Sequence, residues 1–341
     1  MSDDVLILAL PSKGRLHDLA VEFLDDCGFG VRKSGDGREY VAKLSGIEGV
    51  SIIYFRPDEI PARIELGDAH VGLTGEDLYR EYGESHHASH LLIPDLGFGG
   101  ARLVVGVPQS WIDVSTIDDL DEAAMLFHQR HGRSLRVATK FGRLTRAFFA
   151  EHGIVEYTLV ESAGATEGAP AAGVADLIVD LTSTGATMAQ NHLKEIEGGT
   201  VIASHCCMIA CAKERAWTRA RLGALEHVVE QIEARGRARN TLVLRFSIPH
   251  ETAAQTLRTL GLKHGCTPTT VRTQDEGLAT RDHVVALCHP SKVHAAVNFL
   301  RHAGAGQTIV DRSEFLYQGG SAAIAAFQDV LKRRASHPAE G

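Results

Sequence analysis

The chain has 341 residues, and its 35 Lys and Arg against 43 Asp and Glu give a formal net charge of −8. Hydrophobic residues make up 44% of the chain and charged residues 23%, a composition that excludes an intrinsically disordered protein. The acidic balance argues against a general nucleic-acid-binding protein, because binding to the nucleic-acid backbone depends on Lys and Arg that neutralise phosphates.

The sequence gives no sign of export or of a membrane. No apolar run approaches the roughly 18 residues of a membrane helix, and the first residues, 1–4, are acidic where a signal peptide would be basic. The six cysteines show no C-x-x-C spacing, which is typical of reduced, buried thiols. We therefore expect a cytoplasmic protein with neither nucleic acid nor a membrane as a partner.

Short β-rich segments alternate with helical patterns through the first half of the chain. The predicted strands are 5–10, 51–55, 69–74, 102–107, 135–139, 157–160, 177–179 and 201–212, and the predicted helices are 17–27, 59–65, 144–152 and 187–193. Strands that alternate with helices indicate βαβ units. We therefore expect an α/β fold with a largely parallel sheet covered by helices on both faces.

The pattern changes after a long predicted helix at 214–235. The next predicted elements follow the order βαββαβ, with strands at 241–248, 269–273, 283–288 and 307–311 and helices at 251–260 and 291–303. This order is typical of a ferredoxin-like module. We expect a separate C-terminal domain over 240–320, followed by a last helix and a tail at 321–341.

The most informative segment begins at the strand 177–179. Asp180 follows this strand, and then four hydroxyl residues and Gly185 lead directly into a predicted helix. A helix N-terminus offers unpaired N–H donors and a partial positive charge, and an ordinary N-cap needs only one hydroxyl. We therefore predict that a phosphate group is bound by Thr182, Ser183, Thr184, Gly185, Ala186 and Thr187. Asp180 is placed to accept hydrogen bonds from sugar hydroxyls beside that phosphate.

Further charged residues lie where other predicted strands begin or end. The cations and the glycine among them are Lys13, Gly14, Arg15, Arg56, Arg102 and Lys140, and the one carboxylate is Glu167. Each of them alone could be an ordinary solvated side chain, and Glu167 could cap the following turn. Because they all belong to one edge of the predicted sheet, together they favour a single cleft for phosphorylated ligands.

Two clusters resemble metal sites but have simpler explanations. His86, His87 and His90 lie in a polar segment without a nearby pair of carboxylates, so solvated side chains are the favoured interpretation. Cys206, Cys207 and Cys211 lie in an apolar segment that is typical of a buried strand. We predict no protein-borne metal site from either cluster.

Several of these segments resemble the motifs of the ATP phosphoribosyltransferase family, the first enzymes of histidine biosynthesis. The matching segments occur in family order between about residues 5 and 213: 12–16, 56 with 59–61, 71–77, 98–102, 138–140, 164–170, 176–188 and 191–195. The C-terminal module resembles the regulatory domain of the family's long form in its arrangement.

This resemblance implies a fold and a reaction. It implies two lobes similar to type II periplasmic binding proteins, with lobe one at 1–95 and 196–213 and lobe two at 96–195. A connector at 214–236 and an ACT-like ferredoxin domain would follow. The reaction joins N1 of ATP to C1 of phosphoribosyl pyrophosphate and releases pyrophosphate, with Mg²⁺ carried by the substrates. L-histidine is the implied inhibitor, and a homo-oligomer between dimer and hexamer is the implied assembly.

The resemblance also implies roles for the candidate residues. The 182–187 segment would hold the 5′-phosphate, and Asp180 the ribose hydroxyls. Lys13, Arg15, Arg56 and Arg102 would face pyrophosphate and triphosphate oxygens, while Glu167 and Lys140 belong to ligand-lining loops without separable roles.

Two other functions are compatible with a bilobed protein that carries a small regulatory domain. A prephenate dehydratase would not need the hydroxyl-rich segment at 182–187. A non-catalytic, ligand-binding regulatory subunit should lose that segment and the cations at 13–15, both of which this chain keeps.

Overall fold

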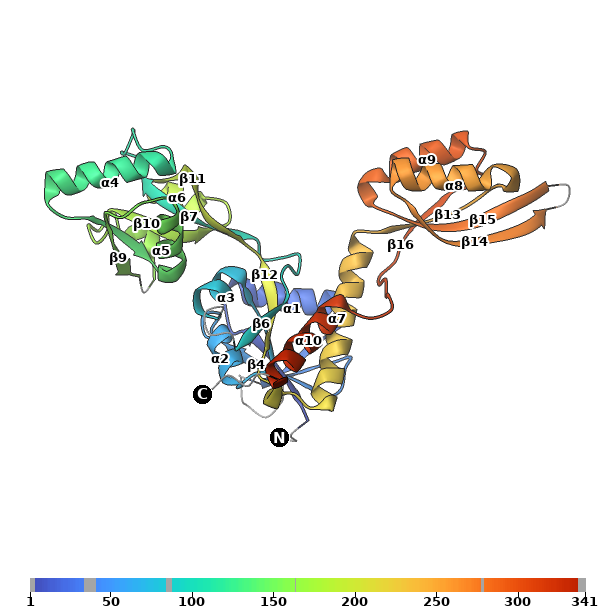
Figure 1. Cartoon of the computed structure of the whole chain (residues 1–341), viewed down its shortest axis with the longest axis horizontal. Coiled ribbons are helices and arrows are strands. Elements are labelled where there is room, and N and C mark those ends of the chain that lie inside the picture. The colour runs from blue at the N-terminus through green and yellow to red at the C-terminus, as the bar shows by residue number, and fades with distance from the viewer. Residues whose placement is uncertain (1–3, 34–40, 84–87, 163, 277–278, 337–341) are drawn as a thin grey trace. The chain divides into compact units, whose positions relative to one another are not determined.

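The computed structural model describes residues 4–33, 41–83, 88–162, 164–276 and 279–336 (Figure 1). The chain divides into two compact units. The first comprises Met1–Leu225 and Ala323–Gly341, and the second comprises Glu226–Ala322. The first unit contains two mixed sheets, which define lobe one and lobe two, and the second contains one four-stranded sheet.

Lobe one is built on a seven-stranded sheet in the order β2-β3-β4-β1-β5-β12-β6. Its strands are β1 (Leu6–Pro11), β2 (Val31–Lys33), β3 (Val41–Leu44), β4 (Val50–Phe55), β5 (Val71–Gly75), β6 (Ser89–Ile93) and β12 (Cys206–Cys211). Its helices are α1 (Arg15–Asp26), α2 (Ile60–Leu66) and α3 (Glu76–Tyr82). Parallel pairing is confined to β1 with β4 and β5. The pairs β2–β3, β3–β4, β5–β12 and β12–β6 are antiparallel. Only antiparallel neighbours can be joined by a short turn, as β3 and β4 are, whereas β12 returns to this sheet after the whole of lobe two.

Lobe two has the strand order β11-β7-β10-β8-β9. Its strands are β7 (Ala101–Pro108), β8 (Leu135–Thr139), β9 (Tyr157–Glu161), β10 (Leu177–Thr182) and β11 (Leu193–Ser204). Its helices are α4 (Ile117–His131), α5 (Gly142–Glu151), the 3-10 turn η2 (Thr166–Gly168) and the single-turn α6 (Ala186–Gln190). Strands β8, β9 and β10 are parallel, whereas β7 and β11 are antiparallel to their neighbours. The expectation of a largely parallel sheet is therefore wrong for the outer strands of both lobes.

The segment 201–212, predicted as one strand, contributes to two sheets. Its first part belongs to β11 in lobe two, and after His205 the chain continues as β12 in lobe one. The expected boundary at 196 thus differs from the position where the chain changes sheets. The only break in this apolar segment is the pair Ser204 and His205 at the junction, which is too short to mark a change of sheet in the hydrophobic pattern.

The second unit has the expected order βαββαβ. After the 3-10 turn η3 (Glu214–Ala216), α7 (Arg219–Arg239) begins in the first unit and ends in the second. The following elements are β13 (Leu242–Pro249), α8 (His250–His264), β14 (Thr267–Glu276), β15 (Ala279–Cys288), the 3-10 turn η4 (Pro290–Lys292), α9 (Val293–His302) and β16 (Ile309–Arg312). The sheet order is β14-β15-β13-β16. Helices α8 and α9 cover one face of this sheet (Figure 1), which confirms the ferredoxin-like arrangement.

The last helix, α10 (Ala322–Ser336), belongs to the first unit from Ala323 on. Phe327 is fully buried there, with its ring 5.2 Å from the Trp217 ring and 5.6 Å from the His90 ring. The Arg334 guanidinium donates to the Ala212 carbonyl at 3.5 Å. These contacts make the C-terminal helix part of the core of the first unit.

All six cysteines are free and buried, as the sequence predicts. Of the two clusters considered as metal sites, His86 and His87 lie outside the described residues. No helix in the described part of the chain is both long and apolar enough to cross a membrane.

Candidate active site

In lobe one, the predicted cations lie where two neighbouring parallel strands end. Pro11 of β1 pairs with Phe55 of β4, so the 12–15 segment and Arg56 leave the sheet at the same edge. Lys13 and Arg15 are exposed. Gly14 has a φ of 81° at the start of α1, a backbone conformation that favours glycine.

Arg56 already has a partner within its own turn. Its guanidinium forms a 3.1 Å ion pair with Asp58, and its amide donates to Glu59 at 3.2 Å. The side chain is 63% exposed. Because surface pairs of this kind are weak, Arg56 can exchange Asp58 for a phosphate at little energetic cost.

In lobe two, the charges of Glu167 and Lys140 lie close enough to Asp180 to change its pKa. Thr139 of β8 pairs with Val179 of β10, so Lys140 and Asp180 follow neighbouring parallel positions. Burial raises the pKa of Asp180, the Glu167 carboxylate raises it further, and Lys140 lowers it. The Leu181 amide donates to Asp180 Oδ1 at 2.9 Å. This edge of lobe two therefore combines two carboxylates and one ammonium group.

The hydroxyl-rich segment at 182–187 forms a compact turn with internal hydrogen bonds. The Thr182 hydroxyl is buried and accepts the Gly185 amide at 2.7 Å, and the Thr184 hydroxyl accepts the Ala186 amide at 3.4 Å. Gly185 has a φ of 75°. Ser183, Thr184, Ala186 and Thr187 are exposed. Some of the amides predicted to be unpaired are thus used within the turn, and the exposed hydroxyls are the groups accessible to a ligand.

The helix after this turn is shorter than predicted. A helix was expected over 187–193, but α6 ends at Gln190, and His192 has a φ of 57° just before β11 begins. A helix of one turn has few aligned peptide dipoles. The local hydroxyl and amide groups must therefore provide most of any attraction for a phosphate.

Arg102 lies beside the turn but has a carboxylate partner. It pairs with Thr182 across β7 and β10, and its guanidinium makes a bidentate ion pair with Glu195 at 2.7 and 3.1 Å. Glu195 also approaches the turn, since a Cβ added to Gly185 would lie 3.1 Å from its Oε1. Arg102 is thus held beside the turn by Glu195, and its assignment to pyrophosphate and triphosphate oxygens stays a prediction. Sequence reasoning gave Glu195 no role, although it lies in one of the matching motifs.

The two lobes meet through candidate residues. The Arg15 guanidinium of lobe one donates to the Ser183 hydroxyl of lobe two at 2.5 Å. This contact brings the cationic edge of lobe one to the hydroxyl-rich turn of lobe two. The sequence could not predict it, because 168 residues separate the two side chains.

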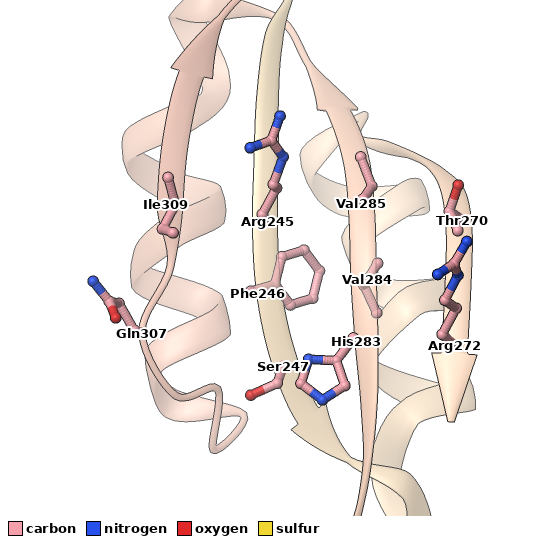
Figure 2. A pocket seen from close by; sticks show the side chains of 10 residues that line it. All are labelled: Arg245, Phe246, Ser247, Thr270, Arg272, His283, Val284, Val285, Gln307 and Ile309. Atoms are coloured by element: carbon pink, nitrogen blue, oxygen red, sulfur yellow. The ribbon is translucent and has the colours of Figure 1, made fainter. Parts of the chain in front are cut away.

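The second unit carries a separate cavity of about 550 Å³ on the sheet face opposite α8 and α9 (Figure 2). Its polar lining consists of Arg245, Ser247, Thr270, Arg272, His283 and Gln307. Ser247, His283 and Arg272 lie side by side on β13, β15 and β14, and Arg245 and Val285 form the row beside them. Arg245 is also paired with Asp311 at 3.1 Å. The cavity therefore offers hydrogen-bond donors to an anionic group.

Comparisons with known proteins identify the family. The ATP phosphoribosyltransferase family model matches residues 56–234. The ATP phosphoribosyltransferase of Caulobacter vibrioides strain NA1000 is 40% identical over 329 residues, which is 96% of this chain and 98% of that protein. The enzyme of Bradyrhizobium sp. strain ORS 278 is 38% identical over 327 residues, again 96% and 98% of the two chains.

A solved structure agrees with the fold. A chain of the ATP phosphoribosyl transferase (HisG:HisZ) complex from Thermotoga maritima matches with a TM-score of 0.50 and 23% identity, over 67% of this chain and 99% of that chain. The similarity at this level concerns the fold alone. The family model and the relatives that match almost the full length show that this chain belongs to the ATP phosphoribosyltransferase family of histidine biosynthesis.

Proposed function

We propose that the facing edges of lobe one and lobe two carry out the family's reaction. In this reaction, N1 of ATP attacks C1 of phosphoribosyl pyrophosphate, and pyrophosphate leaves. The supporting observation is the contact between Arg15 and Ser183, which joins the cationic edge to the hydroxyl-rich turn. Family membership argues against the alternatives of a prephenate dehydratase and of a non-catalytic regulatory subunit.

The turn at 182–187 is the proposed site of the 5′-phosphate. Its exposed hydroxyls can donate to phosphate oxygens, and Arg15 adds a positive charge at Ser183. Asp180, one strand position before the turn, is the proposed acceptor for the ribose hydroxyls. Lys13 and Arg56, both exposed at the edge of lobe one, are the proposed partners of triphosphate and pyrophosphate oxygens.

These residues would act by positioning the reactants and by stabilising charge. As the bond to pyrophosphate breaks, negative charge develops on the leaving group and C1 gains oxocarbenium character. Cations in the cleft stabilise the leaving group, and the closed cleft holds N1 in line with C1. Adenine N1 attacks as a neutral lone pair, so the step needs no general base. Glu167 and Lys140, which both influence Asp180, would set the charge around the ribose.

Magnesium is proposed to enter with the substrates. In the described part of the chain, no group of three or more His, Cys, Asp or Glu side chains could hold a metal ion. Mg²⁺ in phosphoryl and pyrophosphoryl sites is commonly held by one or two carboxylates together with substrate phosphates. Asp180 and Glu167 fit such a partial set, and the bound ion would neutralise charge on the leaving pyrophosphate.

Asp180→Ala tests this assignment. If Asp180 holds the ribose, the variant should lose turnover and should no longer gain thermal stability when phosphoribosyl pyrophosphate is added. A ligand raises the melting temperature because it binds the folded state and not the unfolded state. Unchanged steady-state kinetics in the purified variant would remove Asp180 from the site.

We also infer that L-histidine inhibits the enzyme through the second unit, at the cavity of Figure 2. The α-carboxylate of an amino acid would find donors in Arg245 and Arg272, and its polar side chain would find Ser247 and His283. Arg245→Ala and Arg272→Ala should each raise the histidine concentration needed for half inhibition. Arg258→Ala, an exposed arginine on α8, is the matched control. Equal inhibition of all three variants would place the inhibitor elsewhere.

We further propose a cytoplasmic homo-oligomer, between a dimer and a hexamer. The family membership supports the proposal. Analytical ultracentrifugation at micromolar protein concentration tests the assembly, and a purely monomeric sample would contradict it.

A further inference from the structure

Helix α3 of lobe one contacts lobe two through three of its residues, Leu78, Glu81 and Tyr82. Leu78 packs against the hydrophobic core of lobe two, although it belongs to a helix that follows β5 of lobe one. At the end of the same helix, Glu81 contacts the first turn of α5, and Tyr82 contacts the turn between β8 and α5. The first contact is apolar and the other two are hydrogen bonds, so α3 joins the lobes by independent interactions.

Glu81 supplies the N-terminal cap that α5 lacks. No side chain at Phe141 caps α5, and its first turn contains no acidic residue. The Arg143 amide donates to Glu81 Oε1 at 2.8 Å, and the Leu144 amide donates to Glu81 Oε2 at 2.9 Å. Glu81 is only 9% exposed. A buried carboxylate at a helix N-terminus satisfies unpaired amides and interacts favourably with the helix dipole.

Tyr82 contacts Lys140, two residues before the first residue of α5. Its hydroxyl donates to the Lys140 carbonyl at 3.1 Å. The main chain of Lys140 is thus fixed from lobe one, while its exposed side chain stays available on the side of Asp180. The backbone position of Lys140 therefore depends on lobe one as well as on its own sheet.

The contact between Arg15 and Ser183 also joins the two lobes, but it cannot hold them together during turnover. Both side chains belong to the proposed phosphate site, so an incoming phosphate competes for their hydrogen bonds. The contacts of α3 use groups that no substrate needs. They can persist while substrates enter and leave.

From these contacts we propose that Glu81 and Tyr82 are positioning residues for the transferase reaction. They fix the position of the turn between β8 and α5, which carries Lys140, relative to the cationic edge of lobe one. The inference rests on the proposed role of Lys140 at the substrate site. Neither residue touches the substrate, so the effect should appear chiefly in KM, which reports how well the assembled cleft binds.

A double-mutant cycle on kcat/KM tests this inference. Glu81→Gln keeps the shape of the side chain but loses its charge and one of the two acceptor oxygens. It should lower kcat/KM for both substrates about tenfold, the factor that corresponds to one charged cap, with kcat changed less than about twofold. Tyr82→Phe, which removes one neutral hydrogen bond, should lower kcat/KM about threefold. In a Lys140→Ala background, both effects should shrink to less than about twofold.

Asp119 provides a matched control within lobe two. Its carboxylate accepts the Ser115 and Thr116 amides at 2.9 and 2.8 Å before α4, so it makes the same kind of cap without contacting lobe one. Asp119→Asn should lower the melting temperature about as much as Glu81→Gln and leave kcat/KM unchanged.

The inference is overturned if Glu81→Gln keeps the kcat/KM of the unmodified chain, or if its effect is equally large with and without Lys140. If Lys140→Ala alone has no effect, Lys140 is not at the site and the positioning role fails with it. The proposed reaction is tested separately by Asp180→Ala, so the two failures can be distinguished. Tyr82→Phe removes only one hydroxyl, from a residue that is 36% exposed, and it keeps the test valid if Glu81→Gln does not fold.

Discussion

The hydroxyl of Thr182 should determine whether the proposed phosphate turn keeps its shape. Thr182→Val keeps the size and branching of the side chain but removes the acceptor for the Gly185 amide, 2.7 Å away. An amide left without a partner costs about 1–3 kcal/mol when fully buried. Gly185 is only partly buried, so we expect about 1–2 kcal/mol. In kcat/KM for phosphoribosyl pyrophosphate, this corresponds to a loss of about 5- to 30-fold.

Steady-state kinetics with each substrate varied in turn can measure this loss, and Thr182→Ser, which keeps the hydroxyl, should largely restore activity. Thr116→Val is the matched control. The Thr116 hydroxyl accepts the Asp119 amide at 3.2 Å, three residues along, at the start of α4. Thr116→Val should lower stability by a similar amount without changing kcat/KM. The reasoning is refuted if the two valine variants have the same kinetics, or if Thr182→Val raises KM for ATP alone.

Three further predictions concern buried groups of the first unit. Burial, and to a smaller extent the Glu167 carboxylate, raise the pKa of Asp180. The stability that this group contributes is therefore greatest in acid and is lost as the pH rises through the raised pKa. Asp180→Asn should therefore melt at a higher temperature than the unmodified chain at pH 7.5, and a lower melting temperature would contradict this. Burial, followed by a nearby arginine, lowers the pKa of His70 from 6.5 to about 4, and its Nδ1 accepts the Ile7 amide at 2.9 Å. The unfolding free energy should fall by at most about 3 kcal/mol as the pH drops from 6.5 to 4. His70→Asn, which keeps an acceptor at that place, should show a smaller fall in denaturant titrations across this range. Phe327→Ala should lower the unfolding free energy by about 3–5 kcal/mol, and a loss below 1 kcal/mol would show that α10 packs loosely.

The sequence predicts best the elements that carry a strong local pattern. The strand at 135–139 is found at the predicted bounds, and the βαββαβ module has every expected element. Helix α4 was not predicted, although Thr116 and Asp119 form a capping box at its start. Its apolar stripe is weak because Met125 and Leu126 are exposed. Long-range choices, such as the antiparallel outer strands, depend on tertiary pairing that a local pattern does not contain.

The candidate site could be predicted in part for the same reason. Strand ends identify which residues lie at one edge of a sheet, so Asp180 and Lys140 could be grouped in advance. The partners of a charged group could not be predicted, because they come from distant segments. Glu195 forms an ion pair with Arg102, and Glu81 caps a helix in the other lobe. The sequence shows only that α5 has no capping residue of its own, and this alone does not identify Glu81, because the first amides of a helix can also be satisfied by water.

The position of α10 determines how regulation by the second unit can be tested. A chain that ends near Arg235 would lose the cavity of Figure 2, but it would also lose Phe327 from the core of the first unit. Loss of inhibition by histidine in such a chain would then have two explanations, a missing inhibitor site or a damaged catalytic unit. Single substitutions at Arg245 and Arg272 avoid this ambiguity, because both side chains are exposed on the sheet of the second unit. If catalysis is unchanged in both variants and inhibition is lost, the second unit carries the inhibitor site.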